Sequence, residues 1–244
     1  MDFTFGIITT GNYDDFIKII IESIENNNIP NYEIIIVGNT SIQNTDIITI
    51  INFDETIKNG WITRKKNIII QNAKYDNIVL LHDYIKLNLG WYVGFLKFGD
   101  NYDWCINPIF NSDGNRFRDY TLFPYKIPSF NIDSPLDIDT YFANSCLLPY
   151  DYENNIKTNK YMYVSGAYYV IKKNIALQYL LDENLCHNQG EDLELSKRLH
   201  NNGIFIKRNK YSNVTFLKYK DRQIWENEIN SEKLLIYINY CNNL

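Results

Sequence analysis

Short apolar runs alternate with segments of helical periodicity along the first part of the chain. FTFGIITT (3–10) and EIIIVGN (33–39) are typical of buried strands, and between them DDFIKIIIESIENN (14–27) places isoleucines on one helical face. A strand, a helix and a second strand in this order are the opening of a parallel sheet. The pattern continues with a strand at 46–53, a helix at 63–74, a strand at 77–82 and a short helix at 89–99.

The alternation returns after residue 160. YMYVSGAYYVI (161–171) predicts a strand or a strand pair, and two helical segments follow it. The second helix is expected to end near Gly203, which is suited to a C-cap. The expected elements are helices at 172–183, 191–202 and 229–241 and strands at 203–208 and 213–219. The chain therefore predicts one α/β domain over residues 1–244, Rossmann-like, with a mainly parallel central sheet and helices on both faces.

The segment from 110 to 150 is different, because it is polar and aromatic, contains four prolines and has no sustained periodicity. Long irregular segments in compact enzymes are often lids or acceptor-binding loops. We favour a packed loop over a disordered excursion because aromatic residues are frequent in it. Its charged residues Asp113, Arg116, Arg118 and Asp119 are expected to close over the ligands.

Charge and cysteine content narrow the possible functions. A net charge of −5 argues against a broad nucleic-acid-binding face, which needs clustered Lys and Arg. The four cysteines are far apart and have no metal-type spacing, so buried free thiols in a reducing cytosol are the simplest interpretation. The N-terminus has no signal-peptide pattern, and no apolar run approaches the length of a spanning helix. We therefore expect a cytoplasmic protein without a transmembrane segment.

Polar loops follow three of the apolar strands, and such loops converge at one edge of a parallel sheet. Their small and amide side chains can hydrogen-bond a base and a ribose without adding charge. Capping and turn formation explain each loop equally well when it is taken alone. The candidate nucleotide-binding residues are Thr9, Thr10 and Asn12 after the first strand, Gly38 and Asn39 after the second, and His82 after the strand at 77–82.

A basic run opens the predicted helix at 63–74. Arg64 and Lys65 stand where cations oppose the helix dipole, and Asn67 follows them. A bound diphosphate would explain this placement, and a solvated helix face explains it equally well.

Three acidic residues are candidates for chemistry. Asp83 directly follows a buried strand, where a carboxylate can hold a hard cation such as Mn²⁺ or Mg²⁺ on a diphosphate, although a turn cap is the alternative. Glu191 and Asp192 open a helix, where capping is again the alternative. Asp192 would take the proton of an acceptor hydroxyl while Glu191 shapes the site. Gly166 could let a substrate approach the backbone, or mark a bulge.

The ordered set of TTGN, Gly60-x-x-x-Arg64-x-x-Asn67, LHDYI, SGAYYVIKKN and GEDLELSKRL resembles the GT-A glycosyltransferases over most of the chain, especially the large inverting family 2-like group. The resemblance implies a nucleotide-sugar donor, inversion at the anomeric carbon, Asp192 as general base, and His82-Asp83-Tyr84 in place of the D-x-D metal motif. It also implies a nucleotide-binding half at 1–100 and an acceptor-binding and catalytic half at 101–244. Two departures are HDY, with a single carboxylate, and Asn39, where many relatives carry an Asp.

The function that we expect is transfer of a sugar from a UDP-sugar, held with Mn²⁺ or Mg²⁺ on Asp83, to a glycan, protein or lipid-linked acceptor. A catalytically silent GT-A-like module that binds nucleotides or glycans is the competing hypothesis, because HDY supplies only one carboxylate. A sugar-nucleotide-forming nucleotidyltransferase would need a Gly-rich signature bearing Arg and Lys after the first strand. GNYDDF is not such a signature.

Overall fold

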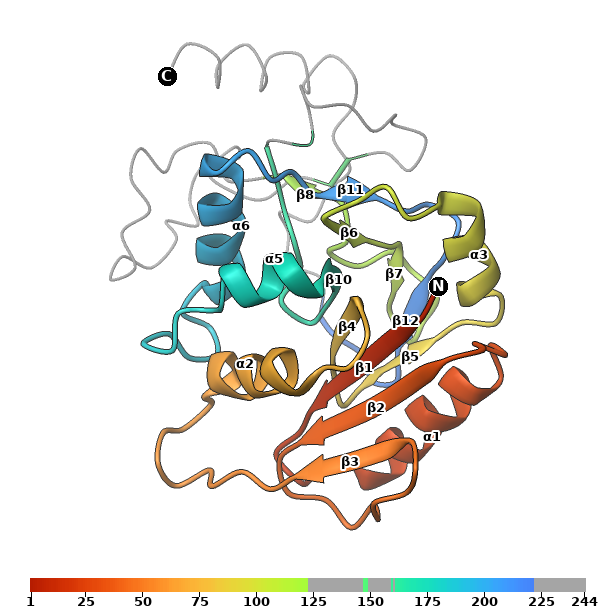
Figure 1. Ribbon diagram of the computed structural model, residues 1–244, viewed down its shortest axis with the longest axis vertical. Helices are drawn as coiled ribbons and strands as arrows, with labels where there is room; N and C mark the ends of the chain where they lie inside the picture. The colour runs from red at the N-terminus through yellow and green to blue at the C-terminus, as the bar shows by residue number, and fades with distance from the viewer. Residues whose placement is uncertain (123–146, 149–158, 160, 222–244) are drawn as a thin grey trace.

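The computed structural model describes residues 1–122, 147–148, 159 and 161–221. Within them the predicted α/β fold is confirmed, with helices on either side of a central sheet (Figure 1). The helices are α1 (Asp14–Glu25), α2 (Ile62–Asn72), α3 (Trp91–Phe98), α5 (Lys173–Gln178) and α6 (Glu191–Asn201).

The central sheet has the strand order β11-β6-β10-β4-β1-β2-β3. Four of its six pairings are parallel, and the two exceptions are the pairings of β10 with β4 and with β6. Because β10 runs against its neighbours, residues that precede it reach the same edge of the sheet as residues that follow β4. These strands are β1 (Phe3–Ile8), β2 (Tyr32–Val37), β3 (Ile48–Ile51), β4 (Asn77–His82), β6 (Trp104–Ile106), β10 (Tyr168–Lys172) and β11 (Lys207–Arg208).

Alternating side chains of β1 determine what covers each face of the sheet. Phe3 packs against Trp91 and Phe95 of α3 at centroid distances of 5.0 and 5.4 Å. On the opposite face, a Cβ at Gly6 would lie 2.2 Å from a methyl carbon of Ile69, so α2 sits directly on the strand. The glycine therefore allows α2 to pack closely, while aromatic side chains fill the other face.

Two smaller sheets flank the central one. In the first, β12 lies between an antiparallel β5 and a parallel β7, and in the second β8 pairs with β9 in the antiparallel sense. The turn at Asp83 and Tyr84 joins β4 to β5, so HDY lies between two strands that belong to different sheets. The bounds are β5 (Ile85–Leu87), β7 (Ile109–Phe110), β8 (Thr121–Leu122), β9 (Met162–Tyr163) and β12 (Val214–Phe216).

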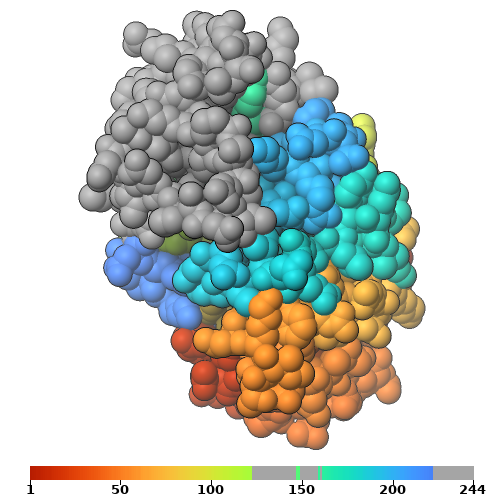
Figure 2. Space-filling view, turned by 90° about the vertical axis from the view of Figure 1, so that its left-hand side faces the viewer, coloured from red at the N-terminus to blue at the C-terminus, as the bar shows by residue number. Residues whose placement is uncertain are grey.

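The start of α2 is fastened to the loop at 181–187. Arg64 forms an ion pair with Glu183 at 2.9 Å, and the side-chain amide of Asn67 bonds both backbone groups of Leu181. Figure 2 shows the two segments, orange and cyan, against one another on the surface. The predicted helix at 172–183 is therefore too long, because α5 ends at Gln178 and the backbone of the following loop pairs with α2 instead.

The remaining predictions concern the end of α6, the strand after it, the cysteines and a membrane-spanning helix. α6 ends at Asn201 and is followed by Gly203 at φ +76°, as the C-cap prediction requires, whereas the strand expected at 203–208 is reduced to β11. Cys105 is a buried free thiol, and Cys186 is a free thiol that is partly exposed. Among the described residues no helix has both the length and the apolar character needed to cross a bilayer. Cys146, Cys241, the helix predicted at 229–241 and most of the segment at 110–150 lie outside the described residues.

Candidate active site

Two adjoining cavities lie where β1 and β4 end and β10 begins. The first, here the Asp83 cavity, has a volume of about 480 Å³, and the second, the Asp192 cavity, about 310 Å³. They share the lining residues His82, Tyr84, His187, Asn188 and Lys220. The Asp83 cavity adds, among others, Thr9, Thr10, Tyr13, Lys65, Asp83 and Lys218. The Asp192 cavity adds, among others, Arg118, Ser165, Gly166, Glu191 and Asp192.

Asp83 is bound to the loop after β1. The Thr9 hydroxyl donates a 2.7 Å hydrogen bond to Asp83 Oδ2 and accepts one from the backbone N–H of Gly11 at 3.0 Å. Asp83 is buried, and burial raises the pKa of its carboxyl, against the opposing effects of the Thr9 hydrogen bond and of Lys218. The carboxylate therefore organises the loop after β1 as well as facing the cavity.

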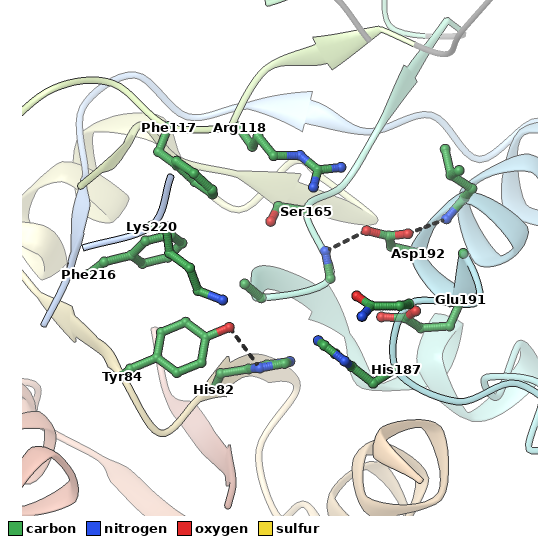
Figure 3. Close-up of a pocket in the computed structure, with 15 residues that line it drawn as sticks. His82, Tyr84, Phe117, Arg118, Ser165, His187, Glu191, Asp192, Phe216 and Lys220 are labelled. Atoms are coloured by element: carbon green, nitrogen blue, oxygen red, sulfur yellow. Dashed lines mark hydrogen bonds between the residues drawn. The ribbon is translucent and has the colours of Figure 1, made fainter. Parts of the chain in front are cut away.

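His82 stands between the two cavities. Its Nδ1 lies 3.1 Å from the Tyr84 hydroxyl, and its Nε2 is buried without a hydrogen-bond partner among the described residues (Figure 3). Burial, followed by the charge on Lys66, holds the pKa of His82 well below its usual range, so the ring is neutral. Its backbone N–H bonds Ala167 O at 3.1 Å, which joins it to the turn before β10. A neutral ring with a free nitrogen can hydrogen-bond a ligand in either cavity.

Asp192 is held by the turn before β10. The backbone N–H of Gly166 donates to Asp192 Oδ2 at 3.0 Å, and the N–H of Leu193 donates to Oδ1 at 2.9 Å. In Figure 3 the side chain faces the cavity, opposite Tyr84, His82 and Lys220. These bonds fix the carboxylate and leave lone pairs on both oxygens for a proton from a bound hydroxyl.

Glu191 precedes Asp192 at the start of α6 and is buried, at the wall of the same cavity. Burial, followed by the negative charge of Asp192, raises the pKa of Glu191 to about 7. A Cβ at Gly166 would lie 2.7 Å from Glu191 Oε1, so the glycine leaves space for this side chain. Glu191 therefore holds its proton to a higher pH than an ordinary glutamate, beside the carboxylate of Asp192.

Lys66 is a residue of this site for which the sequence analysis predicts no separate role. Its ammonium is buried and donates a 2.7 Å hydrogen bond to Gly166 O. Glu191 and Asp192 stabilise its charge, while burial, which is the larger effect, lowers the pKa of Lys66. A single residue, Gly166, thus links α2 to α6, because Lys66 donates to its carbonyl oxygen and its N–H donates to Asp192. Lys66 belongs to the basic run at residues 64–67, but a lysine within a helical pattern gives no sign in the sequence that it is buried.

Lys218 and Lys220 were also not predicted. They follow β12 and line the Asp83 cavity, and Lys220 lines the Asp192 cavity as well. The available sequence signal was LKYKD, in which two lysines two residues apart point the same way from an extended chain.

The predicted nucleotide-sugar-binding residues divide into two sets. Thr9, Thr10, Lys65 and His82 line the Asp83 cavity, although the Lys65 ammonium is already bonded to Thr9 O and to Glu55. Gly166 lines the Asp192 cavity. The predicted residues that line neither cavity are Asn12, Gly38, Asn39, Arg64 and Asn67.

The residues outside the cavities have visible structural roles. Arg64 and Asn67 hold the loop at 181–187, as described above. Gly38 has φ +136°, and a Cβ there would lie 2.1 Å from Thr9 O, so this glycine lets β2 approach the loop after β1. Asn12 and Asn39 are exposed. Their predicted contacts with a nucleotide stay predictions.

A divalent cation does not fit the described donor set at Asp83. Mn²⁺ and Mg²⁺ prefer several hard oxygen ligands, yet no group of three or more His, Cys, Asp or Glu in the described part of the chain is arranged to hold a metal ion. Among the described residues Asp83 is the single carboxylate that lines this cavity, and three lysines, Lys65, Lys218 and Lys220, line it too. The role of Asp83 as a metal ligand stays a prediction that this donor set does not support.

Neither a protein-family model nor any curated protein sequence matches the chain. Its fold, however, is the GT-A glycosyltransferase fold, with a carboxylate-bearing site at the carboxyl ends of the strands. A structure of GalNAc-T7 with UDP, GalNAc and Mn²⁺ matches 98% of this chain and 48% of its own at TM-score 0.60 and 11% identity. A structure of S. aureus TarS 1–349 with UDP-GlcNAc matches 97% and 64% at TM-score 0.54 and 12% identity. The chain thus spans about half the length of the GalNAc-T7 chain and slightly less than two thirds of the TarS chain. At 11% and 12% identity, the similarity shows the fold alone.

Proposed function

We propose that the protein is a glycosyltransferase that moves a hexosyl group from a UDP-sugar to an acceptor hydroxyl, with inversion at the anomeric carbon. The observation that carries the proposal is the joint occurrence of two cavities with shared walls, one containing Asp83 and Thr9 and the other the fixed carboxylate of Asp192. The complexes of similarly folded proteins with UDP and UDP-GlcNAc support a uridine nucleotide.

The larger Asp83 cavity takes the nucleotide in this proposal. Its volume lies within the usual range for small-molecule sites, and the Thr9, Thr10 and His82 side chains offer neutral donors and acceptors to a base and ribose. In this arrangement the diphosphate and the sugar of the donor lie beside the residues that the two cavities share, with the sugar toward Asp192.

Asp192 is the general base of the proposed reaction. It takes the proton of the acceptor hydroxyl as that oxygen bonds to the anomeric carbon, and the bond from this carbon to the diphosphate oxygen breaks with its electron pair on UDP. Gly166 orients the base through its N–H, and Lys66 orients Gly166 through its carbonyl. The acceptor, a glycan, a protein or a lipid-linked sugar, occupies the Asp192 cavity.

A donor screen with Asp192→Asn tests the proposal. Release of UDP, GDP and dTDP from their sugar nucleotides is measured for the wild type, for Asp192→Asn and for the control Asp15→Asn, whose side chain is largely exposed on α1. We expect UDP release, a loss of about 100-fold or more in kcat for Asp192→Asn, and an unchanged UDP affinity, because the base acts in the chemical step.

Two results would contradict the proposal. Wild-type turnover by Asp192→Asn would remove this residue as the base. Tight UDP binding by the wild type without release from any donor, in the presence of candidate acceptors, would instead identify the silent binding module.

A further inference from the structure

Lys218 and Lys220 converge on one aromatic ring at the wall of the Asp83 cavity. The ammonium of Lys218 lies 4.1 Å from the centroid of the Tyr84 ring, and that of Lys220 lies 4.7 Å from it. Lys218 also donates a 3.2 Å hydrogen bond to the Tyr13 hydroxyl. Figure 3 shows the Lys220 side chain reaching toward the cavity beside Tyr84. Tyr219, between the two lysines, is 55% exposed.

The backbone that carries the two lysines is anchored at both ends. Leu217 N–H bonds Tyr84 O at 2.8 Å. The side-chain amide of the buried Asn111 accepts from Lys220 N–H at 2.9 Å and donates to Lys220 O at 2.6 Å. The lysines are thus presented by a fixed segment, which reduces the entropic cost of binding a ligand with them.

This corner of the site carries an excess of positive charge. Among the described residues, no carboxylate lies within ion-pair distance of Lys218 or Lys220, whereas Lys65 in the same cavity is paired with Glu55. Burial lowers the pKa of Lys220, and the charges of Lys218 and Arg118 lower it further. Within the described part of the chain, Asp83 is the acidic group that raises the pKa of Lys220 against this trend. An anion bound between the lysines would relieve their mutual repulsion.

We propose that Lys218 and Lys220 bind the diphosphate of the donor directly and compensate the negative charge that develops on it, so that nucleotide binding does not require a divalent cation. This inference rests on the proposed function. When the bond from the anomeric carbon to the diphosphate oxygen breaks, the electron pair remains on that oxygen, and the two ammonium groups stabilise it.

The electrostatics of the site favour lysines over a metal ion. A dication placed beside Asp83 would gain one carboxylate ligand and would be repelled by two ammonium groups. A diphosphate has the opposite sign and is attracted by both. The aromatic rings of Tyr13 and Tyr84 keep water from part of each ammonium, which strengthens its interaction with phosphate oxygens.

The test compares uridine and UDP as probes in isothermal titration calorimetry, first in excess EDTA and then with Mn²⁺. Uridine lacks the diphosphate, so the ratio of the two affinities isolates the phosphate contribution. We expect the wild type to bind UDP much more tightly than uridine in EDTA. Lys218→Met and Lys220→Met should each weaken UDP by about tenfold or more and leave uridine unchanged, since each removes a charged hydrogen-bond donor. Lys210→Met, at an exposed lysine outside both cavities, is the matched control.

A second measurement keeps the test informative if a methionine disturbs the packing around Tyr84. The variants Lys218→Arg and Lys220→Arg retain the charge and should keep most of the preference for UDP. In the wild type, raising the KCl concentration should reduce the UDP affinity and leave the uridine affinity constant.

The outcomes separate this inference from the proposed function. The lysine proposal alone is overturned if the wild type binds uridine in EDTA, binds UDP no more tightly than uridine until Mn²⁺ is added, and is unaffected by the lysine substitutions. Failure of the wild type to bind uridine or UDP under either condition overturns both proposals, because the donor class itself is then wrong.

Discussion

The backbone N–H of Gly166 donates a 3.0 Å hydrogen bond to the carboxylate of Asp192, which joins the turn before β10 to the first turn of α6. The same peptide region receives the Lys66 ammonium from α2. The orientation of the proposed base therefore depends on three elements that are far apart in sequence, and substitutions in any of them should affect turnover before they affect nucleotide binding.

Gly166→Ala should lower turnover strongly. The new Cβ would lie 2.7 Å from Glu191 Oε1 and 3.3 Å from Asp192 Oδ2, so the acidic pair must move. We expect a stability loss of about 1–3 kcal/mol from overpacking, measured by urea unfolding, together with a fall in kcat. Adding Glu191→Asp, which shortens the clashing side chain, should restore part of the stability. If Gly166→Ala alone has wild-type stability, the close packing described for this turn is incorrect.

Lys66→Met should reduce kcat while leaving UDP affinity intact. The substitution removes the hydrogen bond to Gly166 O and a buried cation that interacts with both Glu191 and Asp192, at a cost of about 1–3 kcal/mol for a buried charged bond. Lys65→Met provides the contrast, because Lys65 bonds Thr9 O in the Asp83 cavity. That variant should weaken UDP binding more than it lowers kcat. Equal effects of the two variants on both parameters would argue against separate roles for the two lysines.

Glu191→Gln should change how stability depends on pH. In the wild type the pKa of Glu191 rises from an ordinary 4.5 to about 7, so between these values the folded state binds more protons than the unfolded state. Wild-type stability should therefore fall as pH rises from about 4.5 to about 7, by at most about 3 kcal/mol from this group. Glutamine does not titrate, so the free energy of unfolding of the variant should rise relative to that of the wild type as pH increases across this window. Parallel stability curves for the two proteins would rule out the raised pKa.

Gly38→Ala should lower the free energy of unfolding more than Gly90→Ala does. Both glycines have positive φ, at +136° and +84°, but a Cβ at Gly38 would lie 2.1 Å from Thr9 O whereas nothing lies within 4 Å of one at Gly90. Gly90→Ala should cost only the strain of about 1–2 kcal/mol. Gly38→Ala should cost more and also weaken UDP binding, since the Thr9 loop must shift. Urea unfolding with UDP titration checks both, and a smaller loss at Gly38 than at Gly90 would count against the close approach of β2 to Thr9.

The sequence predicted the framework of the sheet better than its directions. Apolar runs and helical periodicity located β1, β2, β4, α1 and α2 because these elements have one clear apolar pattern each. The antiparallel sense of β10 was not visible, because YYVIK is buried and apolar in either direction. The length of α5 was overestimated because the side chain of Asn67, more than a hundred residues away, captures the backbone that would have continued the helix.

In the candidate site, too, the features that depend on contacts between distant residues could not be predicted from the sequence. Thr9, His82, Asp83, Gly166 and Asp192 were predicted from their positions beside strands and a helix start, and all of them line the two cavities. The roles of lysines were harder to infer, because a lysine in a sequence looks solvated. Lys65 and Lys66 are buried by contacts with Thr9 and Gly166, and Lys218 depends on the distant ring of Tyr84. Only the folded chain brings those partners together.

The position of β10 has a mechanical consequence. Because β10 is hydrogen-bonded along β4, the Thr9 side of the site and the Gly166 side belong to one continuous sheet, and His82 N–H crosses directly to Ala167 O. Opening the two cavities away from each other would break ladder bonds between these strands. The spacing between the Asp83 cavity and the Asp192 cavity is thus set by backbone geometry, so a ligand that occupies both must match a fixed distance.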